Sequence, residues 1–493
     1  MDVSIFGLLD FQTIIMVMIG VFCGIVFGVI PGLTATMGIA LFIPFTFALP
    51  PVDGISLLLG VYVGGIYGGS VTAILIRTPG TPSSAATVLD GYPMTENGEA
   101  GRALKYATVS SFVGGIFSCL VMLLVAPKIA AVGLQFGAPE FFALAIFGLS
   151  VVGSVSGENI TKGLIAACLG LFISTIGLDP IGGTSRFSFD SMSLLSGVSL
   201  IPALIGLFAV SQVLHEVEKK SGENLRKPKY VSNKVPLKEM FSKWIEFLRA
   251  SVIGTIVGLI PGSGTSIATF ISYNESKRFS KTPEEYGKGK PEGVIATEAS
   301  NNAVTGGALI PLLTLGIPGD VVTAIILGGF LVQGLTPGPM LFANNPEIVY
   351  GIFITIIVAN IFMLFFGLAG IRLFAHIVKV PKKLLLPIVV IFCLIGSYAI
   401  TNNIFDIWVV LAFSVIGYYM EKFKYPLPPL ILGVVLGPII ESNLRRALIQ
   451  SQQDISIFFT KPISAIFLSI VIISIFFPIF KYIWKSMRSS HAS

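Results

Sequence analysis

The chain has 493 residues, of which 54% are hydrophobic and 12% are charged, and its mean hydropathy is +0.87. A soluble globular domain carries roughly 25% charged residues, so this composition excludes an ordinary soluble domain and indicates a polytopic membrane protein. The formal net charge of +6 does not indicate nucleic-acid binding, because the surplus cations lie in short loops between apolar runs of bilayer-spanning length.

The first apolar stretch is interrupted by a proline-glycine break that recurs later in the chain. Residues 24–36 read GIVFGVIPGLTAT, and residues 254–266, which lie 230 positions on, read GTIVGLIPGSGTS. A second break follows each copy, TPGTPSSAAT at 78–87 and GIPGDVVTA at 316–324. Non-helical backbone at membrane depth is tolerated only where it is buried in protein or lines a cavity. Breaks at matching places in two halves therefore predict the binding site of a transporter.

The charge distribution predicts that the second copy of this break lies in a re-entrant hairpin. Eight Lys or Arg residues lie in 219–243 and five more lie in 277–290. Basic loops of this length are typical of the cytoplasmic side, so residues 247–273 between them are expected to enter and leave by the same face. The corresponding residues 12–48 have no Lys or Arg on either side. They are expected to enter from outside, as inverted repeats require.

The other spans are predicted from apolar run length and from the number of crossings that this topology needs. Each hairpin is followed by a broken span, at 55–89 and at 294–330. With the broken spans included, five membrane crossings follow the first hairpin and six follow the second. The uninterrupted spans are expected near 106–126, 139–155, 163–178, 195–214, 348–371, 384–400, 404–420, 428–441 and 456–480.

This arrangement is an all-α polytopic membrane protein made of two inverted repeats. The first repeat covers 1–214, a cytoplasmic basic linker covers 215–246, and the second repeat covers 247–493. The N-terminus is expected outside and the C-terminus inside. In this topology 25 of the 32 Lys and Arg residues lie in inside loops and four lie in outside loops, which is the asymmetry that the positive-inside rule predicts. Arg445 and Arg446 are the least typical, because they fall outside.

The breaks combine free backbone groups with neutral hydroxyl side chains, a combination that suits an anionic ligand. Helix N-termini present amides and a partial positive charge, and glycine lets a ligand approach the backbone closely. Arg77 either binds a substrate carboxylate bidentately or neutralises Asp320. The predicted substrate-binding residues are Gly32, Leu33, Thr34, Arg77, Thr78, Gly80, Thr81, Ser83, Ser84, Gly262, Ser263, Gly264, Thr265 and Ser266.

A carboxylate follows the second break and is a candidate for the coupling ion. Asp320 comes directly after Pro318 and Gly319, and an ionisable residue at this depth is costly and therefore a functional candidate. It is interpreted as a cation ligand, or as a proton acceptor if the motive ion is H⁺. Glu298 is either a cytoplasmic helix end or a site residue, and Asp90 is expected at the inner membrane edge. The predicted Na⁺ ligands are Asn301, Asn302, Thr305, Gly319 and Asp320.

The sequence gives little support to an enzyme, a cofactor site or a channel. It contains no HExxH, GxxxxGK[ST] or GxSxG motif, and the lack of a P-loop argues against ATP hydrolysis by this chain. His215, His376 and His491 are expected in inside loops or the tail, away from a proton relay. The four cysteines fall in apolar segments and are expected to be buried thiols. No span carries the regularly placed charges that an ion channel requires.

Five stretches around the breaks are long enough to be specific. They resemble the large membrane subunit of the tripartite tricarboxylate transporters, the TctA family, over most of residues 20–340. The stretches are GVIPGLTATMGIA (28–40), RTPGTPSSAATVLDGYPM (77–94), GLIPGSGTSIATFISY (258–273), EGVIATEASNNAVTGGALIPLLTLGIPGD (292–320) and GLTPGP (334–339).

The resemblance implies a secondary importer of carboxylates in the bacterial cytoplasmic (inner) membrane. It implies two partners, a small TctB-like membrane subunit and a TctC-like extracytoplasmic solute-binding protein. It also implies that the motif residues line the substrate and ion sites. By analogy with other inverted-repeat carboxylate carriers, an elevator movement is expected.

Electrostatics predicts that such an importer needs a coupling cation. Moving one charge through 100 mV costs about 2.3 kcal/mol, so a dianion entering a negative interior costs about 4.6 kcal/mol. Two monovalent cations cancel this charge, and more make import favourable. Na⁺ is preferred because the breaks offer oxygens and few titratable groups. The alternative is the same architecture carrying another organic acid or an amino acid with H⁺ coupling.

Overall fold

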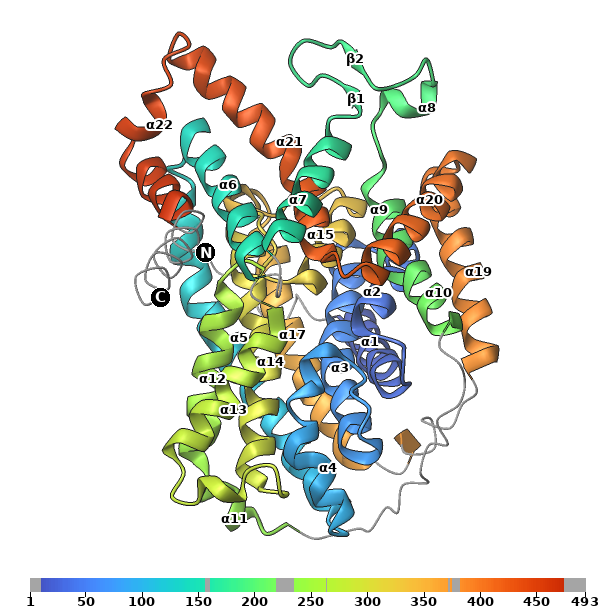
Figure 1. Ribbon diagram of the computed structural model, residues 1–493, viewed down its shortest axis with the longest axis vertical. Coiled ribbons are helices and arrows are strands. Elements are labelled where there is room, and N and C mark those ends of the chain that lie inside the picture. Colours follow the sequence, from blue (N-terminus) through green and yellow to red (C-terminus); the bar gives the residue numbers. More distant parts are fainter. Residues whose placement is uncertain are drawn as a thin grey trace, which may run out of the picture. The chain divides into compact units, whose positions relative to one another are not determined.

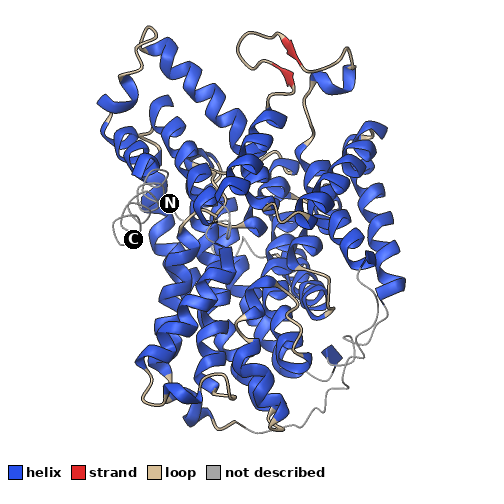
Figure 2. Ribbon diagram, viewed as in Figure 1, coloured by secondary structure: helices blue, strands red, loops and turns tan. Residues whose placement is uncertain are grey.

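The computed structural model describes residues 10–155, 160–218, 235–262, 264–370, 373–374 and 382–473. Ser263, which is predicted to bind substrate, lies outside these residues, as do His376 and His491. The described chain is almost wholly helical, as the sequence predicts (Figure 2). It divides into two compact units, residues 1–131 with 201–418 and residues 132–200 with 419–493, and each is described by itself.

Both predicted hairpins are helix–turn–helix segments of the first unit. A short turn separates the helices of each pair, at 30–34 in the first and at 260–262 in the second. Each turn begins where the proline-glycine pair removes a backbone donor and supplies a glycine with positive φ. The paired helices are α1 (Phe11–Val29) with α2 (Ala35–Thr46), and α12 (Trp244–Leu259) with α13 (Gly264–Phe279) (Figure 1).

In each half, a long helix stops where the second proline-glycine break of that half begins. From here on, the break at 78–87 is called the first break and the break at 316–324 is called the second break. The helix α3 (Pro51–Ile76) stops at the first break, and the chain continues as the 3₁₀ turn η2 (Pro82–Ala85) and the helix α4 (Val88–Glu96). The helix α14 (Pro291–Leu315) stops at the second break and is followed by α15 (Val321–Val332). Both α3 and α14 start with proline in the first turn, where its missing N–H has no intrahelical partner in any case.

The helices before the two breaks form the core of the first unit, because α3 and α14 are buried along nearly their whole length. Glycine allows neighbouring helices to approach them at backbone distance. A Cβ atom on Gly24 of α1 would lie 2.4 Å from the carbonyl oxygen of Val61 in α3. In the second half, a Cβ atom on Gly254 of α12 would lie 2.3 Å from the carbonyl oxygen of Ser300 in α14. Small residues at such contacts are typical of packed membrane helices.

The remaining elements of the first unit include most of the other predicted spans. The span expected near 195–214 contains a π-helical stretch, and the predicted 106–126 span is the centre of a much longer helix whose last residues enter the second unit. The elements are α5 (Ala100–Gly133), α9 (Leu200–Leu204), η3 (Ile205–Val210), α10 (Ser211–Glu218), α11 (Leu237–Phe241), η4 (Pro283–Glu285), α16 (Pro339–Asn344), α17 (Pro346–Ala369), α19 (Lys382–Thr401) and α20 (Ile404–Lys422).

The second unit contains three long helices and a small antiparallel strand pair. The strands β1 (Gly177–Leu178) and β2 (Ser185–Arg186) depart from the all-α prediction, and β1 takes up the end of the span expected near 163–178. The span expected near 456–480 is a short helix followed by a second helix over Pro462–Ile473. The helices are α6 (Ala138–Val155), α7 (Ile160–Ser174), α8 (Met192–Leu195), α21 (Leu427–Gln450) and α22 (Ile457–Thr460).

Two ion pairs hold the strand pair of this unit to the C-terminal part of α21. Arg186 binds Glu441 at 2.8 Å, and Arg445 binds Asp179 at 2.7 Å. The pKa of Asp179 is lowered to about 2, first by the backbone N–H groups of the turn that follows it and then by Arg445. The loop after α7 and the C-terminal part of α21 therefore lie on the same side of this unit. The sequence-based topology also places these two segments on one common side.

Eight of the described helices are long and apolar enough to cross a membrane, and several shorter apolar helices accompany them. The chain is thus a multi-pass membrane protein.

Candidate functional site

The first turn brings predicted residues against a carboxylate of the protein itself. Thr34 caps α2, accepting from the backbone N–H of Met37 at 3.2 Å, and its hydroxyl lies 2.6 Å from that of Thr36. Gly32 has a φ of +92°, and a Cβ atom there would lie 2.2 Å from Oε2 of Glu216. This turn therefore faces a protein carboxylate.

The first break packs directly against the first helix–turn–helix segment. A Cβ atom on Gly80 would lie 2.1 Å from the carbonyl oxygen of Gly28, and the N–H of Gly80 donates to the carbonyl of Gly69 at 3.1 Å. Only glycine fits this approach. The predicted substrate residue Gly80 is thus packed against the end of α1, just before the first turn.

Hydroxyl groups beyond the first break form a closed local network. Thr81 Oγ1 lies 2.9 Å from the hydroxyl of Ser83 and 3.2 Å from that of Ser84. Ser84 also donates to the carbonyl of Thr81 at 2.9 Å, and all three side chains are buried. Thr81 is thus the neutral N-cap of η2 and forms a capping box with Ser84.

The second turn and the second break contact each other through the backbone. The N–H of Gly262 donates to the carbonyl of Gly319 at 2.7 Å, and a Cβ atom on Gly319 would lie 2.6 Å from Cα of Ala308 in α14. Gly264 starts α13 at a φ of +73°, and the predicted residues Thr265 and Ser266 that follow are half-buried. Each break therefore lies against the turn of its own half.

Elements of the two halves also meet within the first unit. The helix α13 contacts the 3₁₀ turn η2, and α15 contacts α2. The predicted substrate residues at the start of α13 and in η2 therefore lie on neighbouring elements.

The two breaks have the same backbone design at a constant offset of 239 residues. The residue directly after α3 is Arg77, and the residue directly after α14 is Gly316. Both have a left-handed backbone conformation, with φ of 59° and 73°. The next helix begins in each case with a capping box. In the first break this pairs Thr81 with Ser84, and in the second it pairs Asp320 with Thr323. The N-cap is a neutral hydroxyl in one break and a carboxylate in the other.

Asp320 is almost fully buried and is held by neutral donors. Its Oδ1 accepts from the backbone N–H of Thr323 at 2.7 Å and from the hydroxyl of the same residue at 2.8 Å. Its Oδ2 accepts from the hydroxyl of Tyr62 in α3 at 2.9 Å. Arg77, the alternative partner considered from the sequence, is exposed and lies over the ring of Tyr92 at 5.8 Å instead.

The predicted amide ligands of α14 are fully buried and lack partners. Neither the side-chain nitrogen nor the side-chain oxygen of Asn301 or Asn302 makes a hydrogen bond among the described residues. Thr305 donates to the carbonyl of Asn302 at 2.6 Å. Buried amides without partners are costly, so these oxygens are available to a ligand.

One buried amide was missed by the sequence analysis. Asn360 of α17 is fully buried, and its nitrogen donates to the carbonyl of Ile356 at 2.8 Å, but its Oδ1 has no hydrogen-bond partner among the described residues. A Cβ atom on Gly115 of α5 would lie 1.9 Å from that oxygen. A single amide inside the apolar run 348–371 was the signal that could have found it.

Glu298 is fully buried and is therefore not an exposed helix end. Its carboxylate is fully buried in α14 and accepts from Ser70 at 2.5 Å, from Ser111 at 3.2 Å and from the hydroxyl of Thr87. These hydroxyls come from α3, from α5 and from the residue before α4, so sequence proximity gave no sign of them.

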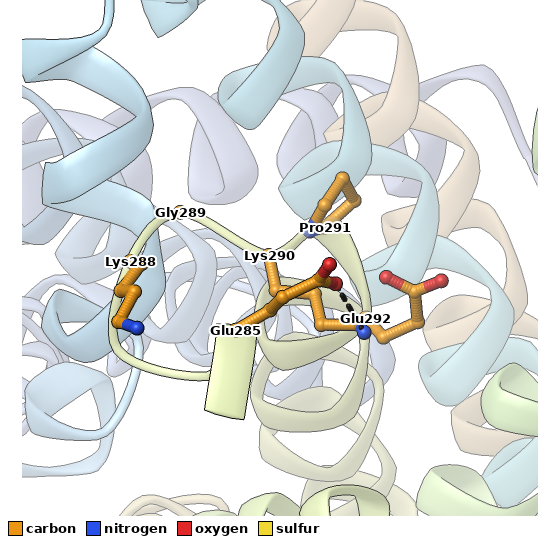
Figure 3. Close-up of a pocket in the computed structure, with 6 residues that line it drawn as sticks. All are labelled: Glu285, Lys288, Gly289, Lys290, Pro291 and Glu292. Atoms are coloured by element: carbon orange, nitrogen blue, oxygen red, sulfur yellow. Dashed lines mark hydrogen bonds and ion pairs between the residues drawn. The ribbon is translucent and has the colours of Figure 1, made fainter. Parts of the chain in front are cut away.

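Asp90 holds the loop that precedes α14. Its Oδ1 accepts from the backbone N–H groups of Gly287, Gly289 and Lys290, each at 2.9 Å, and its Oδ2 accepts from the hydroxyl of Tyr273 at 2.9 Å. A hollow of about 310 Å³ opens at the same loop, where Lys290 pairs with Glu285 (Figure 3). The residues lining this hollow include none of the predicted substrate or cation ligands.

Comparison with known proteins agrees with these motifs. The model of a family described as "Tripartite tricarboxylate transporter TctA family" matches residues 14–432. An Agrobacterium vitis protein described as an uncharacterized 52.8 kDa protein in the TAR-I ttuC′ 3′ region is 39% identical over 453 residues, covering 92% of this chain and 90% of the relative. A second A. vitis protein, from the TAR-II ttuC′ 3′ region, is 40% identical over 222 residues, covering 45% and 92% respectively. No solved structure matches the chain.

Proposed function

From the premise that the chain belongs to the tripartite tricarboxylate transporter TctA family, we propose that it imports di- or tricarboxylates by Na⁺ symport. The family identifies the chain as a transporter component and not an enzyme. As the large subunit of a tripartite system, it is proposed to work with a small TctB-like membrane subunit. A TctC-like solute-binding protein would deliver the substrate.

The observation that carries this proposal is the difference between two breaks of the same backbone design. The first break contains Thr81, a neutral N-cap surrounded by the hydroxyls of Ser83 and Ser84 and carrying no carboxylate that would repel an anion. The second ends in Asp320, a buried carboxylate whose donors among the described residues are all neutral. The first break is therefore the better place for a carboxylate substrate, and the second is the better place for a cation.

The substrate is proposed to lie between the first break and the start of α13. The side chains of Thr265 and Ser266 are half-buried there, so they are open to a ligand, and α13 contacts η2. Arg77 lies at the edge of this region, and its exposed guanidinium is free to turn toward a substrate carboxylate. The hydroxyls of the first break supply the remaining donors.

The coupling ions are proposed to bind along α14 and at the second break. Asn301 and Asn302 present unpartnered buried oxygens, and Thr305, Gly319 and Asp320 add hydroxyl, carbonyl and carboxylate oxygens. Hard oxygens of this kind suit Na⁺. Entry of a dianion against 100 mV costs about 4.6 kcal/mol, so at least two monovalent cations must enter with it.

The topology is proposed to be two inverted repeats in the bacterial inner membrane, with the N-terminus outside, the C-terminus inside and an elevator movement. The shared 239-residue offset of the breaks supports a duplicated design. The ion pair between Asp179 and Arg445 supports the placement of the C-terminal part of α21 on the same side as the loop after α7.

The experiment that tests the proposal is uptake of labelled citrate, tartrate, succinate, malate and glutamate into vesicles. The vesicles contain this chain, its small membrane subunit and its binding protein. Accumulation of one di- or tricarboxylate only under an inward Na⁺ gradient is the expected result. Accumulation driven equally well by a pH gradient alone would contradict Na⁺ coupling. No accumulation of any acid under either gradient would overturn the carboxylate assignment.

A further inference from the structure

The buried carboxylate of Glu298 is not explained by a single cation site at the second break. It lies in the middle of α14 and is fully buried. Its two oxygens accept from Ser70 of α3, Ser111 of α5 and Thr87. Three elements distant in sequence thus converge on one carboxylate.

These contacts satisfy the hydrogen bonds of Glu298 but not its charge. Among the residues that the structure describes, no Lys, Arg or His forms an ion pair with it. All three donors are neutral hydroxyls. An isolated carboxylate in a low-dielectric interior is strongly disfavoured unless a cation accompanies it or it takes up a proton. The arrangement therefore calls for a positive ion.

Unpartnered amides lie one turn along the same helix. Asn301 and Asn302 follow Glu298 at the third and fourth positions, so their side chains emerge next to it, roughly 5–6 Å away. Both are fully buried, and their oxygens have no partners in the described chain. A carboxylate, three hydroxyls and two free amide oxygens provide the hard oxygen ligands that Na⁺ prefers.

The amides lie closer along the helix to Glu298 than to the second break. Gly319 packs against Ala308, which is six or seven residues beyond the amides, or about 10 Å at 1.5 Å per residue. The oxygens proposed as cation ligands therefore divide into two groups. One surrounds Glu298 and the other surrounds Asp320.

We infer that Glu298 is the carboxylate of a second Na⁺ site, separate from the site at Asp320. The inference rests on the proposed function, which requires at least two cations for each dianion. It gives each cation its own buried carboxylate. The ligands of the second site are the carboxylate of Glu298, the hydroxyls that contact it and an amide oxygen of Asn301 or Asn302.

Equilibrium binding of ²²Na⁺ to the purified full-length chain tests this inference without transport. Wild type is expected to bind two Na⁺. Glu298→Gln and Asp320→Asn are each expected to bind one, and the double variant is expected to bind none. The matched control is Glu292→Gln, the same chemical change on the same helix at a residue that pairs with Lys243, and it should bind two.

A second variant protects the test against misfolding of Glu298→Gln. Ser111→Ala removes one hydroxyl ligand and keeps the carboxylate, so one of the two Na⁺ is expected to bind about tenfold more weakly. Two Na⁺ bound to folded Glu298→Gln, or unchanged Na⁺ affinity in Ser111→Ala, would overturn the second site. The second site would also be overturned if Glu298→Gln kept its Na⁺ binding and lost only the pH dependence of uptake.

Failure of this inference is distinguishable from failure of the proposed function. The proposed function fails if wild-type vesicles show no Na⁺-driven carboxylate uptake. The second site fails if uptake is Na⁺-driven but Glu298→Gln leaves the number of bound Na⁺ unchanged.

Discussion

The two breaks of this chain share a backbone and differ in chemistry. Each follows a long buried helix, passes through a left-handed residue and begins the next helix with a capping box. The first uses Arg77 and Thr81 where the second uses Gly316 and Asp320. The same backbone frame therefore carries a neutral hydroxyl at its N-cap in one break and a carboxylate at its N-cap in the other.

The largest effect on transport is expected when the first break is given the carboxylate of the second. Thr81→Asp places a carboxylate where the substrate carboxylate is proposed to bind. Like charges facing each other cost several kcal/mol, so kcat/KM for uptake should fall at least about 100-fold. The measurement is the concentration dependence of initial uptake in vesicles.

Thr81→Asn is the matched control, because asparagine is a good N-cap of the same shape without the charge. It should keep kcat/KM within about tenfold of wild type. Equal losses in both variants would show that the size of the side chain, and not its charge, matters at this position.

Alanine substitutions at one tightly packed glycine in each break test whether the two breaks are packed alike. Gly80→Ala and Gly319→Ala should each lower the free energy of unfolding by about 1–3 kcal/mol, because the added Cβ meets another backbone or a buried alanine. The loss should be larger for Gly80, whose Cβ would lie 2.1 Å from a carbonyl oxygen. Thermal unfolding in detergent measures it. Gly351→Ala, whose Cβ would make an ordinary 3.4 Å contact, is the control, and an equal loss there would contradict the packing argument.

Arg77→Gly makes the first break resemble the second at its left-handed residue. Removing a side chain from this conformation should raise the free energy of unfolding by about 1 kcal/mol. If Arg77 meets the substrate, kcat/KM for uptake should fall about tenfold at the same time. Opposite changes in stability and transport are the expected signature, and unchanged transport would remove Arg77 from the substrate site.

Asp179 provides a reference carboxylate, because it has the arginine partner that Asp320 lacks. Turn amides and Arg445 lower its pKa from 3.8 to about 2, so its contribution to stability is full above about pH 4 and is lost as the pH falls toward 2. Asp179→Asn should flatten the wild-type change in unfolding temperature over this range and leave Na⁺ dependence unchanged. An altered Na⁺ dependence would contradict the distinction between the two carboxylates.

The sequence predicted the breaks well because their causes are local. Proline removes a donor and glycine adopts a positive φ, so Pro31-Gly32 and Pro318-Gly319 mark the ends of helices without reference to the rest of the chain. Apolar run length likewise predicted most spans. The short strand pair after α7 was missed, because two-residue strands leave no alternating pattern to detect.

The polar partners were not predictable in the same way. Glu298 stands in ATEASNN, a stretch that reads equally well as a solvated helix end, and its hydroxyl partners lie about 190 to 230 positions away in the chain. Tyr62 gave no sign that it would donate to Asp320. Tertiary packing alone brings these groups together, whereas periodicity reports only which helix face is apolar.

The most direct test of the division between the two breaks is one pair of titrations on two variants. Initial uptake is measured against substrate concentration and against Na⁺ concentration for Thr81→Ala and Asp320→Asn. Thr81→Ala is expected to raise the KM for the carboxylate and to leave the Na⁺ dependence near wild type, and Asp320→Asn is expected to do the reverse. If both variants shift the same titration, or if the two effects are exchanged, the assignment of substrate and cation to the two breaks is wrong.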